Sequence, residues 1–252
     1  MTEPSHTIEP TAATEALLLG TAQDAGVPHI GCDCRTCALA RRDPRQRQLP
    51  ASLALMDHHA GASWVIDATP AFPEQLDMLH EHAPRCRLAG VLLTHAHIGH
   101  YTGLMYLGRE ALNASAVPVY ASAVLCAYLT ANGPWSQLVA LGNINLRPFT
   151  AAVPVRLSEH LRVTPMQVPH RAEFSDTMAY LVRGSTRSLF YCPDIDRWEQ
   201  WSESLPHFLE TVDVALLDGT FFSAAELPGR DLTEIPHPPV RETAELLAGT
   251  KR

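Results

Sequence analysis

The sequence lacks any apolar run that could cross a membrane. Its longest apolar runs, such as Ala89–Leu93, fall far short of the ~20 residues that a transmembrane helix needs. The N-terminus has neither the basic start nor the apolar stretch of a signal peptide. We therefore expect a cytoplasmic protein without a membrane partner, in a compartment where disulfides are rare.

Basic residues are also scarce. The chain of 252 residues holds 19 Lys and Arg against 27 Asp and Glu, which gives a net charge of −8. A nucleic-acid-binding surface needs an excess of positive charge, so we expect a small-molecule substrate and no nucleic-acid specificity. No cluster of Arg or Lys marks a phosphate site, and the pattern leaves open whether the chain forms a homodimer.

The sequence contains no low-complexity tract and no clear linker. We expect residues 1–14 to form a flexible tail and residues 15–252 to form a single domain. Short apolar runs alternate with helical periodicities along the chain, which predicts an α/β layered fold. Strands are expected at Leu17–Leu19, Ser52–Met56, Ser63–Ile66, Leu88–Leu93, Val117–Tyr120, Ile144–Phe149, Leu161–Val168, Met178–Val182, Ser188–Tyr191 and Val212–Leu217. Helices are expected at Phe72–His82, after His100 through Leu112, around Val124–Leu129, at Arg197–Leu205 and at Val240–Leu247.

Histidine and cysteine are abundant instead, with 13 and 6 copies, and both are common ligands of transition metals. His95, His97 and His100 follow a buried strand, at the end where α/β sheets usually hold ligands. Residues 95 and 97 point to the same side of an extended segment, so their imidazoles can meet one ion. A solvated, His-rich turn is the alternative, but the preceding Val91–Leu93 ties the cluster to the core.

The segment Thr94-His-Ala-His-Ile-Gly-His100 resembles the His-x-His-x-Asp-His signature of the metallo-β-lactamase fold. The resemblance covers roughly residues 15–220 and implies an αββα sandwich, with two mixed sheets packed between helices. It also implies that Asp67 buttresses the site, that His170 is the next metal ligand and that Asp194 is a bridging ligand. Taken singly, each of these three could be a turn, loop or helix-start residue, and Asp196 rivals Asp194. Asp218, which also ends a strand, is a candidate outer residue that supports the ligands.

One position departs from the signature, because Gly99 stands where the family has Asp. In a two-metal site that Asp and the third histidine serve the second ion, so its loss weakens the second position. His95, His97 and His170 then remain as a three-histidine set with an open fourth position, as in a catalytic zinc site. Asp194 and His100 are the expected catalytic residues, which position a second ion or the attacking water. One or two active-site zinc ions are expected, and the ligand types also suit iron or manganese.

Cys32, Cys34 and Cys37 lie within six residues, and thiolates this close favour a structural zinc ion with one further ligand. A redox pair or unrelated free thiols are the alternatives, whereas the isolated Cys86, Cys126 and Cys192 need only be buried. The loop that begins at Thr21 is similar to that of two subfamilies. These are pyrroloquinoline quinone (PQQ) biosynthesis protein B and the cyclic-phosphate phosphodiesterase of the carbon–phosphorus lyase pathway, in which a late histidine completes the cysteine site.

Relatives of this kind close with a further strand and histidine-bearing loop, and we expect this chain to lack them. His237 is the only late histidine, either an exposed loop residue or a substitute ligand. The leading hypothesis is a metal-dependent hydrolase, in which metal-bound hydroxide attacks a phosphodiester or other ester-like substrate. The second is an iron-dependent, oxygen-using enzyme of PQQ biosynthesis. The third is a non-catalytic member of the fold that binds a metal or small molecule.

Overall fold

The structure, a computed structural model, describes residues 13–171, 173–226, 229 and 236–250. Eleven strands in the described residues form two sheets. The six-stranded sheet has the order β1-β2-β3-β4-β5-β6, from Thr14–Gly20, Ser52–Asp57, Ala62–Ile66, Arg87–Leu92, Val117–Ser122 and Ile144–Phe149. The five-stranded sheet has the order β11-β10-β9-β8-β7, from Val214–Leu217, Ser188–Cys192, Thr177–Arg183, Arg162–Val168 and Val155–Arg156.

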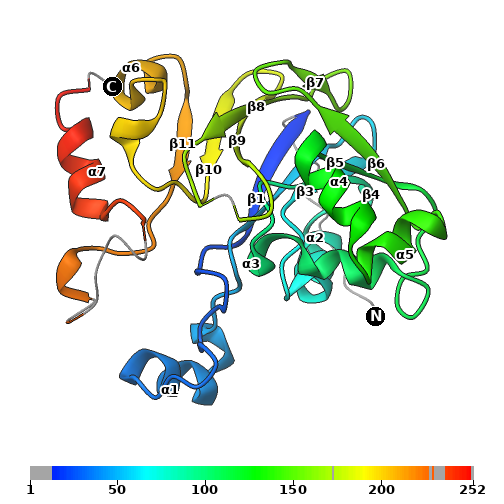
Figure 1. Ribbon diagram of the computed structural model, residues 1–252, viewed down its shortest axis with the longest axis horizontal. Coiled ribbons are helices and arrows are strands. Elements are labelled where there is room, and N and C mark those ends of the chain that lie inside the picture. Colours follow the sequence, from blue (N-terminus) through cyan, green and yellow to red (C-terminus); the bar gives the residue numbers. More distant parts are fainter. Residues whose placement is uncertain (1–12, 172, 227–228, 230–235, 251–252) are drawn as a thin grey trace, which may run out of the picture.

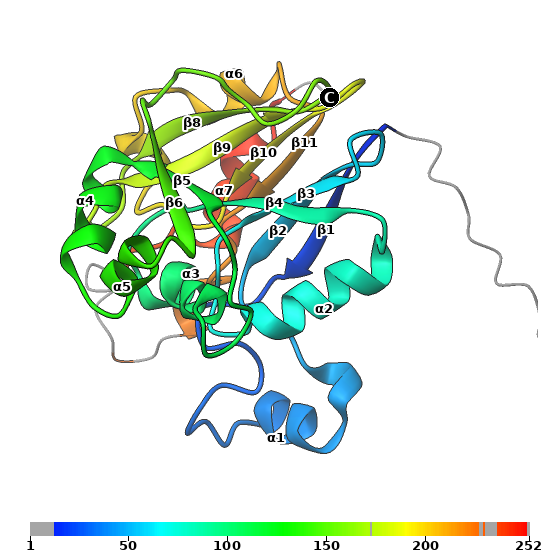
Figure 2. The ribbon, with the colours of Figure 1, turned by 90° about the vertical axis from the view of Figure 1, so that its right-hand side faces the viewer.

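Helices cover the outer faces of the two sheets, which pack against each other (Figures 1 and 2). On the six-stranded sheet these are α2 to α5, at Phe72–His82, Ile98–Tyr101, Ala123–Ala131 and Trp135–Ala140. On the five-stranded sheet they are α6 and α7, at Leu205–Leu209 and Val240–Leu247. The remaining α1, Arg35–Arg42, lies away from both sheets (Figure 1). The αββα sandwich implied by the resemblance is therefore confirmed.

The alternation of side chains along the strands explains why three apolar cores form. In β2, Ala54 and Met56 pack toward the helices, whereas Leu53 and Leu55 pack between the two sheets. Because successive side chains point to opposite faces, a strand with a layer on each side must be apolar throughout. Every residue of β2 is accordingly buried. A third core lies between the five-stranded sheet and its helices and includes Phe190.

Several expected elements agree closely with the structure, including α2 and the antiparallel β2–β3 hairpin. The expected helix over Arg197–Leu205 is wrong, because only a 3₁₀ turn, Trp198–Gln200, precedes α6. Pro206 lies in the first turn of α6, and its ring would clash with a preceding helical turn, so a continuous helix cannot run from Arg197 into α6. The helix expected to run through Leu112 also ends early, as a 3₁₀ helix over Thr102–Leu107 that stops before Gly108. Helix α5 and strand β7 were not expected.

The ends of the chain agree only partly with expectation. The expected tail over residues 1–14 lies mostly outside the described residues, and β1 already begins at Thr14. No strand follows β11 in the part of the chain that is described, where α7 is the last element. None of the described helices is long and apolar enough to cross a membrane.

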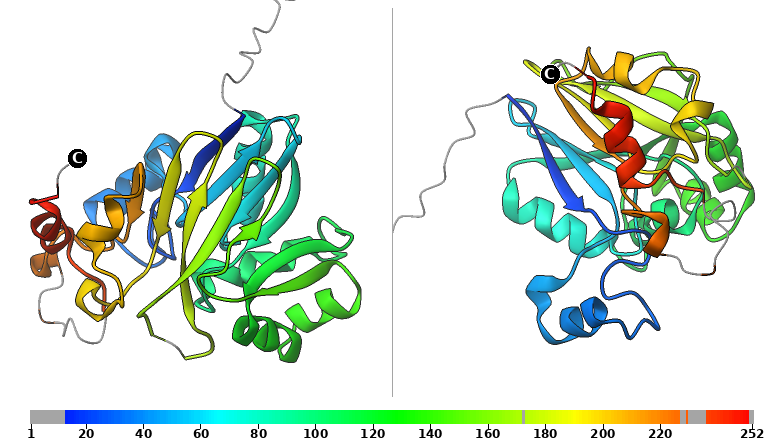
Figure 3. Two further views of the ribbon diagram at one scale, coloured as in Figure 1. Left: turned by 90° about the horizontal axis from the view of Figure 1, so that it is seen from above. Right: turned by 90° about the vertical axis from the view of Figure 1, so that its left-hand side faces the viewer.

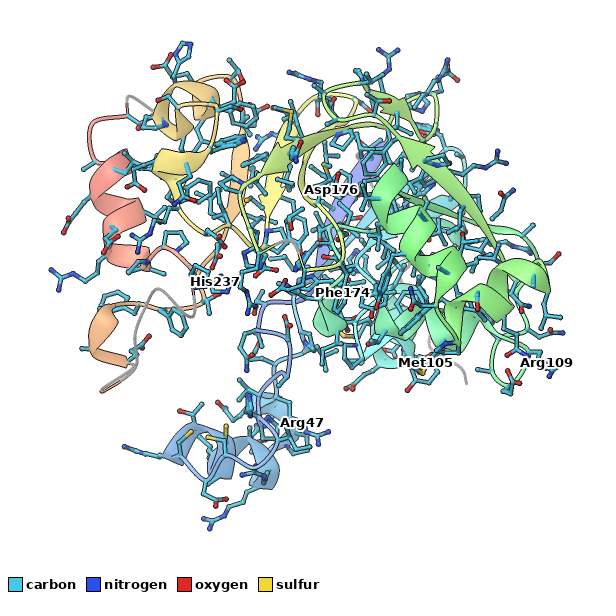
Figure 4. The ribbon with its side chains drawn as sticks, viewed as in Figure 1. Arg47, Met105, Arg109, Phe174, Asp176 and His237 are labelled. Atoms are coloured by element: carbon cyan, nitrogen blue, oxygen red, sulfur yellow. The ribbon has the colours of Figure 1, made fainter. Side chains whose placement is uncertain are left out.

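Strand direction decides where the polar side chains gather. Strands β3 and β4 run parallel to each other, and so do β10 and β11. The carboxyl ends of each pair therefore meet at one edge of its sheet, and loops from both sheets converge there (Figure 3). Figure 4 shows His237 and Phe174 at this junction, with the segment around α1 beyond it.

Candidate metal centre

Five strand ends supply the candidate site. Asp67 follows β3, the histidine-rich segment follows β4, and His170 follows β8. Asp194 and Asp218 follow β10 and β11. Residues as far apart in the sequence as Asp67 and Asp218, which are separated by 151 positions, thus reach one place because their strands end at the same edge, as is usual for ligand sites in α/β sheets.

His95, His97 and His170 each offer a ring nitrogen to a shared space, with the offered atoms within 4.8 Å of one another. The opposite nitrogen of each ring has an outer partner. His95 Nδ1 lies 2.9 Å from Thr94 Oγ1, and His170 Nδ1 donates to Asp196 Oδ1 at 2.7 Å. His97 Nε2 lies 3.0 Å from Glu173 Oε2, so that its Nδ1 faces His170 Nε2 at 3.3 Å. Outer partners of this kind fix the orientation of metal-binding imidazoles.

His100 lies beside this trio and is held between carboxylates. Its Nδ1 donates to Asp67 Oδ2 at 2.8 Å, and its Nε2 lies 2.8 Å from Asp194 Oδ2. Asp67 is fully buried and also accepts the Thr94 N–H at 2.8 Å, so this carboxylate connects the start of the histidine segment to its end. Its φ of 68° lies in the left-handed region, a strained conformation that clusters at functional sites.

The two rival aspartates have different places. Asp194 lies inside the cluster, within 4.8 Å of ring nitrogens of His95 and His100, whereas Asp196 supports His170 from behind. Asp218 Oδ2 accepts the N–H of Ile195, which fixes the loop that carries Asp194. Asp218 thus lies behind the cluster, outside its groups of potential ligand atoms.

His237 enters the same cluster, so that of its two alternatives, an exposed loop residue and a substitute ligand, the structure excludes the first. Its Nδ1 donates to Asp218 Oδ2 at 2.6 Å, and it forms a potential ligand group with His170 and Asp194. Only 10% of its side chain is exposed. His237 is therefore positioned as a potential ligand by its contact with Asp218.

Burial and charge set the protonation of these groups. Burial lowers the pKa of His95 well below its ordinary value, and the positive charge of His100 adds to the effect. Burial also lowers the pKa of His170. For His100, burial alone would lower the pKa, but the carboxylates of Asp194 and Asp67 outweigh it and raise the pKa well above its usual range. Neutral imidazoles at His95 and His170 are the form that binds a metal.

The cluster contains buried atoms that no protein group satisfies. His95 Nε2 is buried and has no hydrogen-bond partner, and the buried Asp194 Oδ2 lies close to His100 Nε2 without a well-aligned hydrogen bond. Leaving a buried polar atom such as His95 Nε2 without a partner costs about 1–3 kcal/mol. A divalent cation would coordinate both atoms, so the residues present fit a metal ion. His and carboxylate donors suit zinc, iron and manganese alike.

Two acidic residues that contact the histidines were not among the residues predicted from the sequence. Asp24 Oδ1 lies 3.2 Å from His100 Nε2, and Glu173 contacts His97. Asp24 lies 75 positions before Gly99, in the loop that also carries the three clustered cysteines. No spacing rule relates these segments, because the contact exists only once the sheets have formed.

The three clustered cysteines also lie together, with sulfur atoms within 4.8 Å of one another. Cys34 caps α1 and accepts the N–H of Cys37, a contact that lowers the pKa of the Cys34 thiol. Arg41 braces the loop by donating to the carbonyl oxygens of Cys32 and His29. All six cysteines are free, and Cys86, Cys126 and Cys192 are buried, as expected.

Comparison with known proteins places the chain in a family. The beta-lactamase superfamily domain matches residues 64–252. Coenzyme PQQ synthesis protein B of Methylobacterium nodulans is 30% identical over 82% of this chain and 73% of its own. The same protein of Stutzerimonas stutzeri is 28% identical over 83% and 74%.

Solved structures agree on the fold. Zn²⁺-bound PqqB from Methylobacterium extorquens has a TM-score of 0.75 and 20% identity, covering 94% of this chain and 85% of its own. A diphosphatase from the PhnP family has a TM-score of 0.68 and 21% identity, covering 94% and 82%. The described chain therefore belongs to the beta-lactamase superfamily, and coenzyme PQQ synthesis protein B is among its relatives.

Proposed function

We propose that this chain is a metal-dependent hydrolase that acts on a phosphodiester or another ester-like substrate. The observation that carries the proposal is the set of three ring nitrogens from His95, His97 and His170, which face one space while their opposite nitrogens are engaged. A zinc ion bound there would act as a Lewis acid and provide a hydroxide nucleophile near neutral pH.

The chain's own residues prepare this chemistry. Asp196 and Glu173 orient the imidazoles of His170 and His97. Asp194 directs Oδ2 into the cluster, 2.8 Å from His100 Nε2 and 3.7 Å from His95 Nε2, where it can help to hold an ion or the attacking water. His100 is oriented by Asp67 at Nδ1, so that its Nε2 faces Asp194 Oδ2 beside the trio, where it can help to position a second ion or the attacking water.

The space next to the histidines can accept a small molecule. A cleft of about 420 Å³ is lined by His170, Glu173 and Phe174, together with Asp176. Phe174 is 59% exposed and packs against Tyr128, so an aromatic wall stands beside the polar one. Such a mixture of an apolar wall and a few polar groups is typical of small-molecule sites.

The test combines metal content with activity. Purified protein is analysed for zinc, iron and manganese per chain and assayed with bis(4-nitrophenyl) phosphate. His97→Ala is expected to lose an ion and most of the activity, whereas His207→Ala, at an exposed position on α6, should behave as wild type. Protein without metal at the histidines, or undiminished hydrolysis by His97→Ala, would contradict the proposal.

The second candidate is an iron-dependent, oxygen-using enzyme of PQQ biosynthesis. It is favoured by the relatives, since coenzyme PQQ synthesis protein B matches over most of this chain. The same histidine set suits ferrous iron. Oxygen uptake that depends on ferrous iron, in a protein without hydrolytic activity, would favour this candidate over the first.

A further inference from the structure

Gly99 and Asp24 share one small volume beside His100. A Cβ atom placed on Gly99 would lie 2.3 Å from Asp24 Cγ and 2.5 Å from its Oδ1. Such distances are far below van der Waals contact, so the Asp24 side chain can hold its present position only if position 99 has no side chain. The backbone at Gly99 does not itself require glycine, because its φ lies outside the left-handed region.

The Asp24 carboxylate contacts the group that the side chain at position 99 would have served. Its Oδ1 lies 3.2 Å from His100 Nε2, and Asp194 Oδ2 lies 2.8 Å from the same nitrogen. Two carboxylates thus converge on one imidazole nitrogen, whose opposite nitrogen is engaged by Asp67. A divalent cation is the ligand that such a set of oxygen and nitrogen donors would take.

The loop that carries Asp24 is held in place by the neighbouring chain. The N–H of Gly26 donates to the carbonyl of Gln23, and Val27 exchanges backbone hydrogen bonds with Gln48. Asp24 also lines an open cleft of about 560 Å³, together with Gly99 and Glu74. The carboxylate is therefore fixed at the histidine cluster and reachable from solvent.

We propose that Asp24 supplies, from the N-terminal loop, the carboxylate that Gly99 lacks, so that Asp24, His100 and Asp194 hold a second divalent cation. This inference rests on the proposed function, which places the first ion at His95, His97 and His170. It replaces the expectation, drawn from Gly99 alone, that the second position is weakened. In this chain the carboxylate comes from the loop after β1, and it fits because Gly99 has no side chain.

The experiment measures zinc binding directly. Metal-depleted full-length protein is titrated with Zn²⁺ by calorimetry, and zinc per chain is counted after dialysis. Asp24→Asn, which keeps the shape but not the charge, should bind one ion fewer, or bind it at least about tenfold more weakly. Glu74→Gln removes a charge from the same cleft and should match wild type.

A carboxylate swap provides the complementary test. Asp24→Gly alone should lose the second ion. The double variant Asp24→Gly/Gly99→Asp, in which the carboxylate comes from position 99 and no longer meets Asp24, should regain it. Unchanged zinc binding by Asp24→Asn, a failure of the double variant to bind, or a single ion in the wild-type histidine cluster would each overturn the role of Asp24. These outcomes would leave the proposed function intact if the wild-type protein still binds the one ion that His97→Ala loses.

Discussion

Replacing Asp67 by Asn tests whether this buried carboxylate orients the metal-binding residues. Asn tolerates the left-handed φ of 68° at this position, so the backbone should stay as it is. The Asn oxygen can still accept the Thr94 N–H, which lies 2.8 Å from Asp67 Oδ1. The amide group, however, then faces His100 Nδ1 where a carboxylate oxygen accepted at 2.8 Å.

The magnitude follows from the loss of that one contact. A hydrogen bond to a charged group contributes about 1.5–3 kcal/mol. If this energy orients His100 for metal binding, zinc affinity should fall by about 10–100-fold, the range typical for residues that support metal ligands. Calorimetric titration of metal-depleted Asp67→Asn with Zn²⁺ measures the change, and urea denaturation measures the accompanying loss of stability.

Asp57→Asn is the matched control. Asp57 is a fully buried carboxylate in the same sheet, but it caps the β2–β3 turn through the N–H groups of His59 and Ala60. The control should lose stability and keep the zinc affinity of wild type. Wild-type zinc affinity in folded Asp67→Asn, or an equal loss in Asp57→Asn, would refute the assigned role of Asp67.

Three further predictions concern other parts of the molecule. Cys37→Ser should lower the zinc content by one ion per chain and leave hydrolysis of bis(4-nitrophenyl) phosphate unchanged, as measured by elemental analysis and assay. His237→Ala should weaken zinc binding at the histidine cluster and destabilise the fold by about 1–3 kcal/mol, because buried Asp218 loses a donor. The Ser158 hydroxyl and the Ala60 N–H outweigh burial and lower the pKa of Asp57, so its contribution to stability is complete well above pH 3.8. Urea titrations should therefore show the wild-type advantage over Asp57→Asn shrinking as the pH falls below that value, and a constant advantage would contradict this.

Features with short-range signals could be predicted from the sequence. The periodicity of Phe72–His82 identified a helix with the same bounds, and the run through Leu92 identified a buried strand. The spacing of His95 and His97 places both rings on one side of an extended chain, and their ring centroids lie 4.4 Å apart. These inferences hold because side-chain direction within a segment depends on local backbone geometry alone.

The elements predicted from the sequence were wrong or missing where packing overrides a local pattern. A helix was expected over Arg197–Leu205, but Trp198 and Trp201 pack into the core at the two ends of a 3₁₀ turn. The short strand β7 carries too few residues for its alternation to be recognised. In both cases neighbouring layers, rather than propensity, select the conformation.

By itself, the sequence determined that histidines follow a buried strand and that three thiols share one loop. Only the tertiary structure decided which distant groups complete the site. Asp24 reaches His100 because the loop after β1 crosses the space that Gly99 leaves open. His237 reaches the cluster because Asp218, at the end of β11, holds it there. Such contacts depend on which strand ends meet, and the order of strands in a sheet is set by the packing of the whole chain.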